Sequence, residues 1–298
     1  MPFLGWPYIQ GESAWGPNTG LYEFCEMDYY ITPYIAEFIS VLTNVGYISL
    51  GIRGIRNNHR NSNDQVVNLC YGNLIFVGVG SALYHMNLKY FTQMIDEASM
   101  LYATAAILYG SLSITMGSTS RKSLATFLTG VIIAASIAHF IICDVQTFRR
   151  TFLVMLFTNL GQCIWLFSSR VPDVGVKRAA RCLALYGTCS FILGFSLWDI
   201  DNKFCAQLTH ARALVGMPLG FLTELHGWWH LWTGVGTYHF IVFIEYLRTY
   251  IKAVEEAEES SSSSSSKRKR KRKPPPTLVW PSRFSLPYVT DLRAATTK

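Results

Sequence analysis

Apolar segments long enough to cross a bilayer recur along most of this chain. A helix needs about twenty residues to cross, because lipid offers no hydrogen-bond partner to an open backbone. Half of the residues are hydrophobic and only 15% are charged, which is typical of a membrane protein. We expect an all-α polytopic membrane protein, a seven-transmembrane helix bundle, with spans near residues 33–52, 66–84, 98–116, 124–142, 151–168, 182–198 and 217–247.

The distribution of Lys and Arg in the loops predicts how these spans are oriented. Residues 1–32 contain neither, so we expect no cleavable signal peptide and a first span that directs insertion. Lys and Arg are more frequent in the loops on the other side, which indicates the cytosol. We therefore expect a lumenal segment at 1–32, a seven-transmembrane catalytic domain at 33–250 and a cytosolic tail at 251–298.

The tail at 251–298 has the composition of a disordered segment. It holds acidic residues, a serine run, a basic run at 267–273 and then prolines. The net charge of +7 reflects this run, so we expect no nucleic-acid partner. The run either contacts anionic lipid headgroups or is a solvated linker, and both interpretations stay open.

Polar residues inside the expected spans gather at one level of the bundle. Ser81 and His85 are four residues apart at the end of the second span, so they share a helix face. Asp96 follows across a short loop, and His226 and His230 share a face of the last span. Since the second span leaves the membrane on the side where the last span enters, all five side chains can meet there.

This combination predicts a hydrolytic zinc site. Three histidines bind zinc and leave a fourth position for water, whose pKa zinc lowers to about 7. Asp96 is placed to move a proton to a leaving amine, and Ser81 to hydrogen-bond a developing oxyanion. Glu224 lies off the histidine face and is expected to support the site from outside. His139 and His239 are expected to be interhelical hydrogen-bonding residues rather than ligands.

An acidic cluster precedes the first span. Glu23, Glu26 and Asp28 lie close together in sequence, and Glu37 lies slightly inside the expected helix. Oxygen ligands without a neighbouring cation indicate calcium, although the spacing does not match an EF-hand loop. A solvated acidic turn is the alternative.

Three stretches of the sequence match a known family. These are WGPNTGLYEFCEMDYYITPYIAEF, GSALYHMNLKYFTQMIDEASMLY and FLTELHGWWHLWTGVGTYHF, in that order. Together they resemble the alkaline ceramidases of a larger superfamily of seven-helix membrane zinc hydrolases, over about residues 15–250. The tail is not covered.

The resemblance implies roles residue by residue. It implies zinc ligands at His85, His226 and His230, with a catalytic aspartate at Asp96 and an active-site serine at Ser81. It also implies a calcium site and a disulfide, whose residues are Glu23, Phe24 through its carbonyl, Glu26, Asp28 and Glu37 for calcium, and Cys25 with Cys205 for the disulfide. A Glu stands at position 23, where relatives often have Asp.

The resemblance also implies the reaction. We expect a ceramide amidohydrolase of the endoplasmic reticulum or Golgi membrane that uses Zn2+ and Ca2+. It would cleave ceramide, dihydroceramide or phytoceramide to a long-chain base and a fatty acid. Two alternatives stay open, a non-catalytic seven-helix receptor and a zinc hydrolase of ester-linked lipids.

Overall fold

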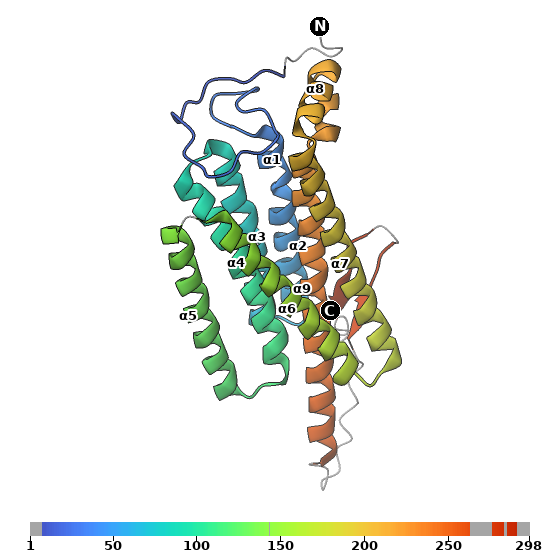
Figure 1. Cartoon of the computed structure of the whole chain (residues 1–298). Coiled ribbons are helices and arrows are strands. Elements are labelled where there is room, and N and C mark those ends of the chain that lie inside the picture. The colour runs from blue at the N-terminus through green and yellow to red at the C-terminus, as the bar shows by residue number, and fades with distance from the viewer. Residues whose placement is uncertain (1–7, 143, 263–275, 283–284, 291–298) are drawn as a thin grey trace.

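Long helices make up most of the protein (Figure 1). The computed structural model describes residues 8–142, 144–262, 276–282 and 285–290. The elements in chain order are α1 (Phe38–Thr43), α2 (Val45–Arg60), α3 (Gln65–Asn87), α4 (Tyr90–Leu112), η1 (Ser113–Thr115), α5 (Ser118–Ile142), α6 (Val145–Ser169), α7 (Val174–Lys203), α8 (Cys205–Val215), η2 (Leu219–Thr223), α9 (Leu225–Ser262), β1 (Thr277–Val279) and β2 (Tyr288–Thr290).

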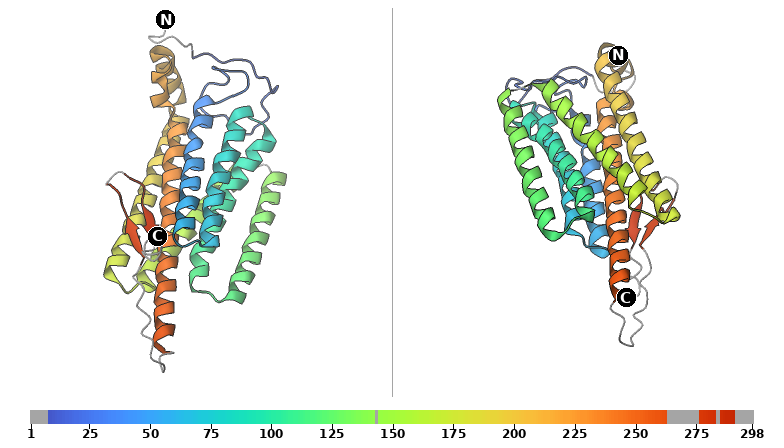
Figure 2. Two further views of the ribbon diagram at one scale, coloured as in Figure 1. Left: turned by 180° about the vertical axis from the view of Figure 1, so that it is seen from behind. Right: turned by 60° about the horizontal axis from the view of Figure 1, so that its bottom comes forward.

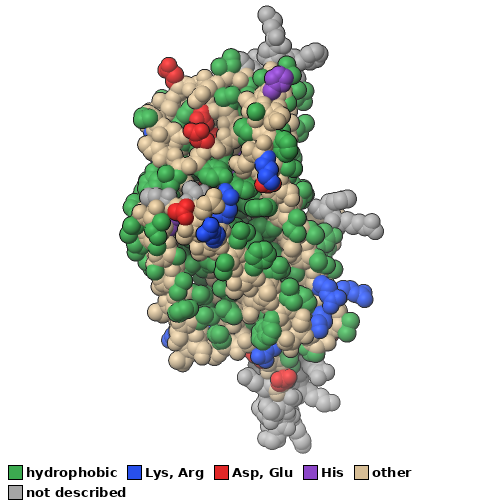
Figure 3. All heavy atoms as spheres, in the orientation of Figure 1, with side chains coloured by type: hydrophobic (Ala, Val, Ile, Leu, Met, Phe, Trp, Pro, Cys, Tyr) green, Lys and Arg blue, Asp and Glu red, His purple; other side chains and the backbone are tan. Residues whose placement is uncertain are grey.

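The helices form a polytopic membrane bundle. Within the described residues, six helices are long and apolar enough to cross a membrane, namely Phe38–Arg60, Gln65–Asn87, Tyr90–Thr115, Ser118–Ile142, Gln146–Ser169 and Val174–Lys203. The first of these joins α1 and α2. Hydrophobic side chains cover much of the surface, and few charged ones lie across its middle (Figure 3).

Three helices begin before the apolar segments that the sequence indicates, and an aspartate caps each of them. Asp64 caps α3 by accepting from the Val66 N–H at 2.9 Å. Asp144 accepts from two N–H groups of the first turn of α6, and Asp173 accepts from the Val176 N–H of α7 at 2.8 Å. These carboxylates satisfy amide groups that a helix leaves without partners, so each helix can begin before its apolar stretch.

The last expected span differs from the observed helix. Residues 217–247 do not form one helix, because η2 interrupts them and α9 begins only at Leu225. α9 then runs through the middle of the bundle against α7, α2 and α3, and residues 238–250 are all buried (Figure 2). A helix that packs inside the bundle needs no uniformly apolar surface, which explains why α9 is not among the described helices that are apolar enough to cross a membrane.

The N-terminal segment folds over one end of the bundle and completes the end of α3. Leu88 takes a left-handed conformation with φ of 50° and ends that helix. The Ala36 and Glu37 N–H groups donate to the carbonyls of Met86 and His85, both at 3.0 Å. The carbonyls that α3 leaves open therefore find partners, and the start of α1 is fixed beside His85.

The expectation of a disordered tail from residue 251 is wrong for two parts of it. α9 continues to Ser262, and β1 pairs with β2 in an antiparallel sheet. The sheet packs against α2 and α9, where Val289 is fully buried and the Tyr238 hydroxyl donates to the Pro287 carbonyl at 3.0 Å. Apolar residues after the prolines supply this contact. The basic run at 267–273 lies outside the described residues.

Candidate metal centre and its cavity

A large cavity opens at the end of the bundle that the N-terminal segment covers. Its volume is about 680 Å³, and residues of α3, α4, α6, α7 and α9 line it together with Tyr22, Phe24 and Tyr47. Most of these residues are apolar or aromatic. The five residues that the sequence predicts for catalysis all line this one cavity, and they are Ser81, His85, Asp96, His226 and His230.

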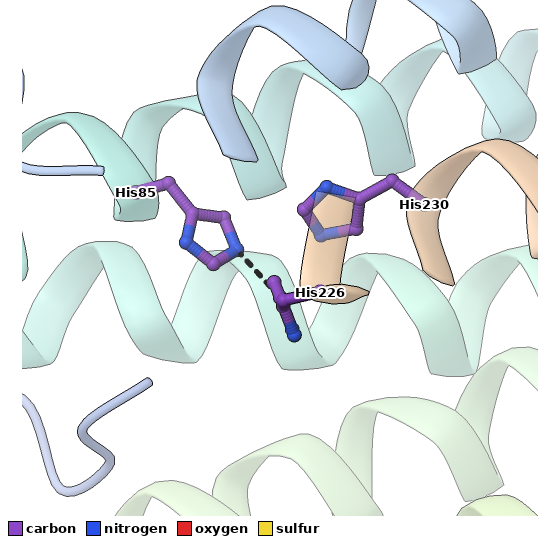
Figure 4. Close-up of side chains that lie close together, drawn as sticks. All are labelled: His85, His226 and His230. Atoms are coloured by element: carbon purple, nitrogen blue, oxygen red, sulfur yellow. Dashed lines mark hydrogen bonds between the residues drawn. The ribbon is translucent and has the colours of Figure 1, made fainter. Parts of the chain in front are cut away.

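The three histidines converge inside the cavity. His85 lies on the last turn of α3, whereas His226 and His230 lie one turn apart on α9 (Figure 4). All three are buried, and one nitrogen atom from each lies within 4.8 Å of the others. The Nε2 atoms of His85 and His226 are 3.3 Å apart. In the described part of the chain, this is the group of metal-ligating side chains that lies close enough to share one ion.

Hydrogen bonds fix which nitrogen atoms of two histidines carry a proton. Nδ1 of His85 contacts the Glu37 carboxyl, and toward an ionised Glu37, which only accepts, this Nδ1 is the donor and Nε2 keeps its lone pair. Thr43 Oγ1 donates to the backbone carbonyls of its own helix and therefore accepts from His230 Nδ1 at 3.0 Å. Both rings consequently present a bare Nε2 atom, as metal-binding histidines do.

The donor set fits zinc or a similar ion. Neutral imidazoles in apolar surroundings suit zinc, and two of the three are oriented by partners behind them. His226 Nδ1 is buried without a hydrogen-bond partner. The Phe24 ring covers the site, with its centroid 4.1 Å from the His226 ring and 5.1 Å from the His85 ring.

Ser81 and Asp96 lie together in the same cavity. Ser81 is one turn before His85, and its hydroxyl lies beside the Asp96 carboxyl, which comes from α4. Asn44 Nδ2 donates to Ser81 Oγ at 2.9 Å. Because the serine oxygen accepts from Asn44, its proton is directed to another acceptor in the cavity. α4 begins at Tyr90, so Asp96 lies almost two turns inside the helix rather than at its opening.

Glu224 supports the site from outside, in agreement with its expected role. It accepts from the Tyr8 hydroxyl at 2.7 Å and pairs with Arg212 at 3.2 Å. The guanidinium of Arg212 is completely buried and also pairs with Asp201 at 3.2 Å. This network joins the N-terminal segment, α7, α8 and the turn before α9. It fixes the position of Glu224 and thereby the start of α9, where His226 follows two residues later.

The residues that the resemblance assigns to calcium are engaged in other contacts. The Glu26 carboxylate accepts from the Ile39 and Ser40 N–H groups at 2.6 and 2.9 Å and so caps α1. Glu37 contacts His85, and Phe24 packs its ring on the histidines. In this arrangement the carboxylates of Glu23, Glu26, Asp28 and Glu37 do not converge within the described residues. They do not fit a shared ion, and calcium binding stays a prediction.

Burial changes the acidity of this cluster. Burial raises the pKa of the Glu26 carboxyl to about 7, against the effect of its hydrogen bonds. Burial and the charge of Glu23 raise the pKa of Asp28 to about 6. The cluster therefore carries less negative charge near neutral pH than its sequence indicates.

The cysteines that the resemblance pairs are joined in the structure. Cys25 and Cys205 form a disulfide with a Cα–Cα distance of 5.3 Å. The bond connects the N-terminal segment to the first residue of α8, 180 residues later in the chain. The loop that carries Phe24 is thereby held over the histidines.

Two further histidines lie apart from the metal centre. His139 of α5 contacts the Glu97 carboxylate of α4, an interhelical pair of the expected kind. His239 hydrogen-bonds within α9 through its Nδ1, at 2.8 Å from the Val235 carbonyl. It packs between the rings of Tyr186 and Trp280. Neither belongs to the metal-ligating group.

Sequence reasoning missed the residues behind the site. Thr43 orients His230 and Asn44 orients Ser81, while Glu37 was assigned to calcium and instead lies against His85. Glu37, Ser40, Thr43 and Asn44 recur at spacings of three and four in an apolar helix. That periodicity places them on one face, and it is the signal that could have found them.

The fold and the site define a class. A membrane-embedded helical bundle holds three imidazoles around one point, with a carboxyl and a hydroxyl beside them, in an apolar cavity. This combination is typical of membrane-embedded metal hydrolases.

Comparison with known proteins gives the family. The sequence model described as Ceramidase matches residues 16–290. The chain is 32% identical over 266 residues to the alkaline ceramidase YPC1 of Saccharomyces cerevisiae, covering 83% of each. It is 32% identical over 246 residues to alkaline ceramidase 3 of Mus musculus, covering 82% of this chain and 89% of the relative. The chain belongs to the ceramidase family.

Proposed function

We propose that this protein is a ceramide amidohydrolase, an alkaline ceramidase that cleaves the N-acyl bond of a ceramide to a long-chain base and a free fatty acid. The observation that carries the proposal is the placement of His85, His226, His230, Asp96 and Ser81 in one apolar cavity. Membership of the ceramidase family names the substrate class.

The cavity suits a lipid amide. Its volume of about 680 Å³ is within the range of roughly 300–1,000 Å³ for ligand pockets. Each methylene group buried among the helices contributes about 0.8 kcal/mol, so the chains of the substrate supply binding energy. The polar residues lie at the end that the N-terminal segment covers, and there the amide group reaches the histidines.

The residues then divide the chemistry. His85, His226 and His230 would hold the metal, and a zinc ion bound there would supply a Lewis acid and lower the pKa of water to about 7. Asp96 accepts the proton of the attacking water and delivers it to the leaving nitrogen. Ser81, whose oxygen accepts from Asn44, donates its own proton to the carbonyl oxygen as that atom gains charge.

The membrane arrangement follows from the same proposal. α9 serves as the seventh span, since it runs through the bundle beside α7. The distribution of Lys and Arg supports a lumenal N-terminus and a cytosolic C-terminus. The disulfide at Cys25 and Cys205 suits an oxidising lumen, and the membrane of the endoplasmic reticulum or Golgi has such a lumen.

The deciding experiment measures fatty-acid release by the purified protein in detergent. The panel contains ceramide, dihydroceramide and phytoceramide together with glycerolipid esters. We expect release from at least one ceramide, with an equal amount of long-chain base. Cleavage of esters but not of amides would favour the ester hydrolase, and no turnover by protein that binds no metal would favour the receptor.

A further inference from the structure

Arg149 is a cation in an otherwise apolar and acidic cavity. Among the described residues that line the cavity, it is the one Lys or Arg. It lies near the start of α6, a helix that carries none of the histidines. Its guanidinium lies over the Trp198 ring, 5.0 Å from the centroid, and Nη2 donates to the Tyr22 hydroxyl at 3.2 Å. These two contacts fix the position of the charge.

The described residues supply Arg149 with no ion-pair partner. The cavity contains two carboxylates, on Asp96 and Glu97 of α4, but Glu97 is engaged by His139 and by Gln93 Nε2 at 2.8 Å. A guanidinium has five N–H donors in a planar fork that matches a carboxylate. A guanidinium without an ion-pair partner, next to the apolar side chains of a cavity, is suited to binding an anion.

Aromatic rings connect Arg149 to the metal centre. The Trp198 ring lies 6.4 Å from that of Trp229, the residue before His230. On the other side, the Tyr22 ring lies 5.0 Å from that of Phe24, which covers His226. Two aromatic rings on each side therefore separate the guanidinium from the histidines. A group that leaves the metal centre can reach the guanidinium without leaving the cavity.

The products of the reaction differ in charge from the substrate. A ceramide is neutral, whereas hydrolysis of its amide gives a carboxylic acid that ionises and an amine that takes up a proton. A carboxylate in an apolar cavity needs a charged partner, because burying it alone is costly. The Asp96 carboxyl of α4 suits the amine, and Arg149 on α6 suits the acid.

We propose that Arg149 binds the carboxylate of the long-chain fatty acid after hydrolysis. The site separates the two products by charge, with the amine beside Asp96 of α4 and the acid at α6. This inference rests on the proposed function, since it takes the ligand from the products of that reaction. It makes Arg149 a product-binding residue rather than a group that takes part in bond cleavage.

The test compares Arg149→Gln with Arg150→Gln. Arg150 is the next residue of α6, is exposed and does not line the cavity, so it is a matched control for charge. Ceramide hydrolysis is measured with added oleate, oleyl alcohol or sphingosine. We expect Arg149→Gln to raise the inhibition constant of oleate about tenfold or more, because the variant loses the charge-assisted hydrogen bonds between the guanidinium and the carboxylate of oleate. The constants for the alcohol and the amine should not change.

A second readout does not depend on turnover. Thermal stabilisation by oleate is measured for the wild type, Arg149→Gln, Arg150→Gln and Arg149→Lys, after size exclusion and zinc analysis show that each protein is folded. Oleate should stabilise the wild type and Arg150→Gln, Arg149→Lys less, and Arg149→Gln least. Equal stabilisation of all four, or equal loss of oleate and oleyl alcohol binding, overturns the proposal. A wild type that binds oleate but hydrolyses no ceramide contradicts the proposed function instead.

Discussion

The two ends of the bundle bury charge in opposite ways. At the end far from the cavity, Asp64 pairs with Arg248 at 3.0 Å and with Lys252 at 2.6 Å. Burial by itself raises the pKa of the Asp64 carboxyl, but the two cations lower it to about 2. Arg248 also donates to Gly110 and Ser113, so α3, α4, η1 and α9 meet where one carboxylate is paired with two cations.

The catalytic end buries more carboxylate than cation. Arg212 alone serves both Asp201 and Glu224, while burial raises the pKa of Glu26 to about 7. Among the described residues, the ion-pair partner of Glu37 is the His85 ring. The far end is therefore arranged for stability, whereas the end with the cavity has fewer buried positive charges than carboxylates. A metal ion at the histidines would supply that charge, and such local imbalance is common where binding takes precedence over stability.

Removal of one histidine should have the largest effect. We expect His226→Ala to lower ceramide hydrolysis by roughly 10³-fold or more, because the ring supplies a metal ligand. Bound zinc should fall from about one per chain in the wild type, measured by elemental analysis alongside fatty-acid release. His59→Ala at the far end is the control, since that ring is exposed and bonds to Asn63. Full activity of His226→Ala would contradict the metal assignment.

A change of the proton-transfer residue should separate catalysis from metal binding. We expect Asp96→Asn to lower kcat by about 10²- to 10⁴-fold while zinc content stays at the wild-type level. Asp199→Asn is the control, because Asp199 pairs with Lys203 on the exposed face of α7. Loss of zinc together with activity would show that Asp96 maintains the site instead of moving a proton.

Breaking the far-end pair should affect stability alone. We expect Arg248→Ala to lower the free energy of unfolding by about 3 kcal/mol, because a buried carboxylate loses its main partner. Lys252→Ala should cost less than about 1 kcal/mol, since that side chain is half exposed. Thermal unfolding in detergent measures both, and the activity per folded, zinc-loaded molecule should be unchanged. A specific loss of activity would couple the far end to catalysis.

The smallest effect concerns pH. Because the pKa of Asp64 is depressed in the folded protein, its stabilisation is present above about pH 4 and is lost as pH falls toward 2. Asp64→Asn keeps a helix cap but removes the charge. The melting temperature of the wild type should exceed that of Asp64→Asn at pH 7, and the difference should shrink between pH 4 and 3. A difference independent of pH would point to the cap instead of the ion pair.

The sequence predicted the membrane bundle and the residues of the candidate site for separate reasons. Apolar length alone indicated spans, and six of them agree with helices in the described residues. Histidine spacing placed His226 and His230 on one face of a helix, as observed. The ends of the helices were predicted less well, because the capping contacts of Asp64, Asp144 and Asp173 depend on short polar turns.

The errors lie where contacts join distant parts of the chain. Composition predicted disorder after residue 251, yet Trp280 and Val289 pack on the bundle. The composition of a segment does not reveal contacts with residues more than thirty positions away in the chain. In the same way, the position of Glu37 in an apolar helix indicated that its carboxylate needs a partner. It did not indicate that this partner is His85.

The sequence by itself determined which residues are candidates for the chemistry, because residue type and helical periodicity decide what can bind a metal and which side chains share a face. Only the tertiary structure decided how they work together. It placed Glu37 and Thr43 behind the histidines, Asn44 behind Ser81 and Arg149 at the cavity. These contacts join separate helices, so they depend on how the helices pack and not on any local pattern.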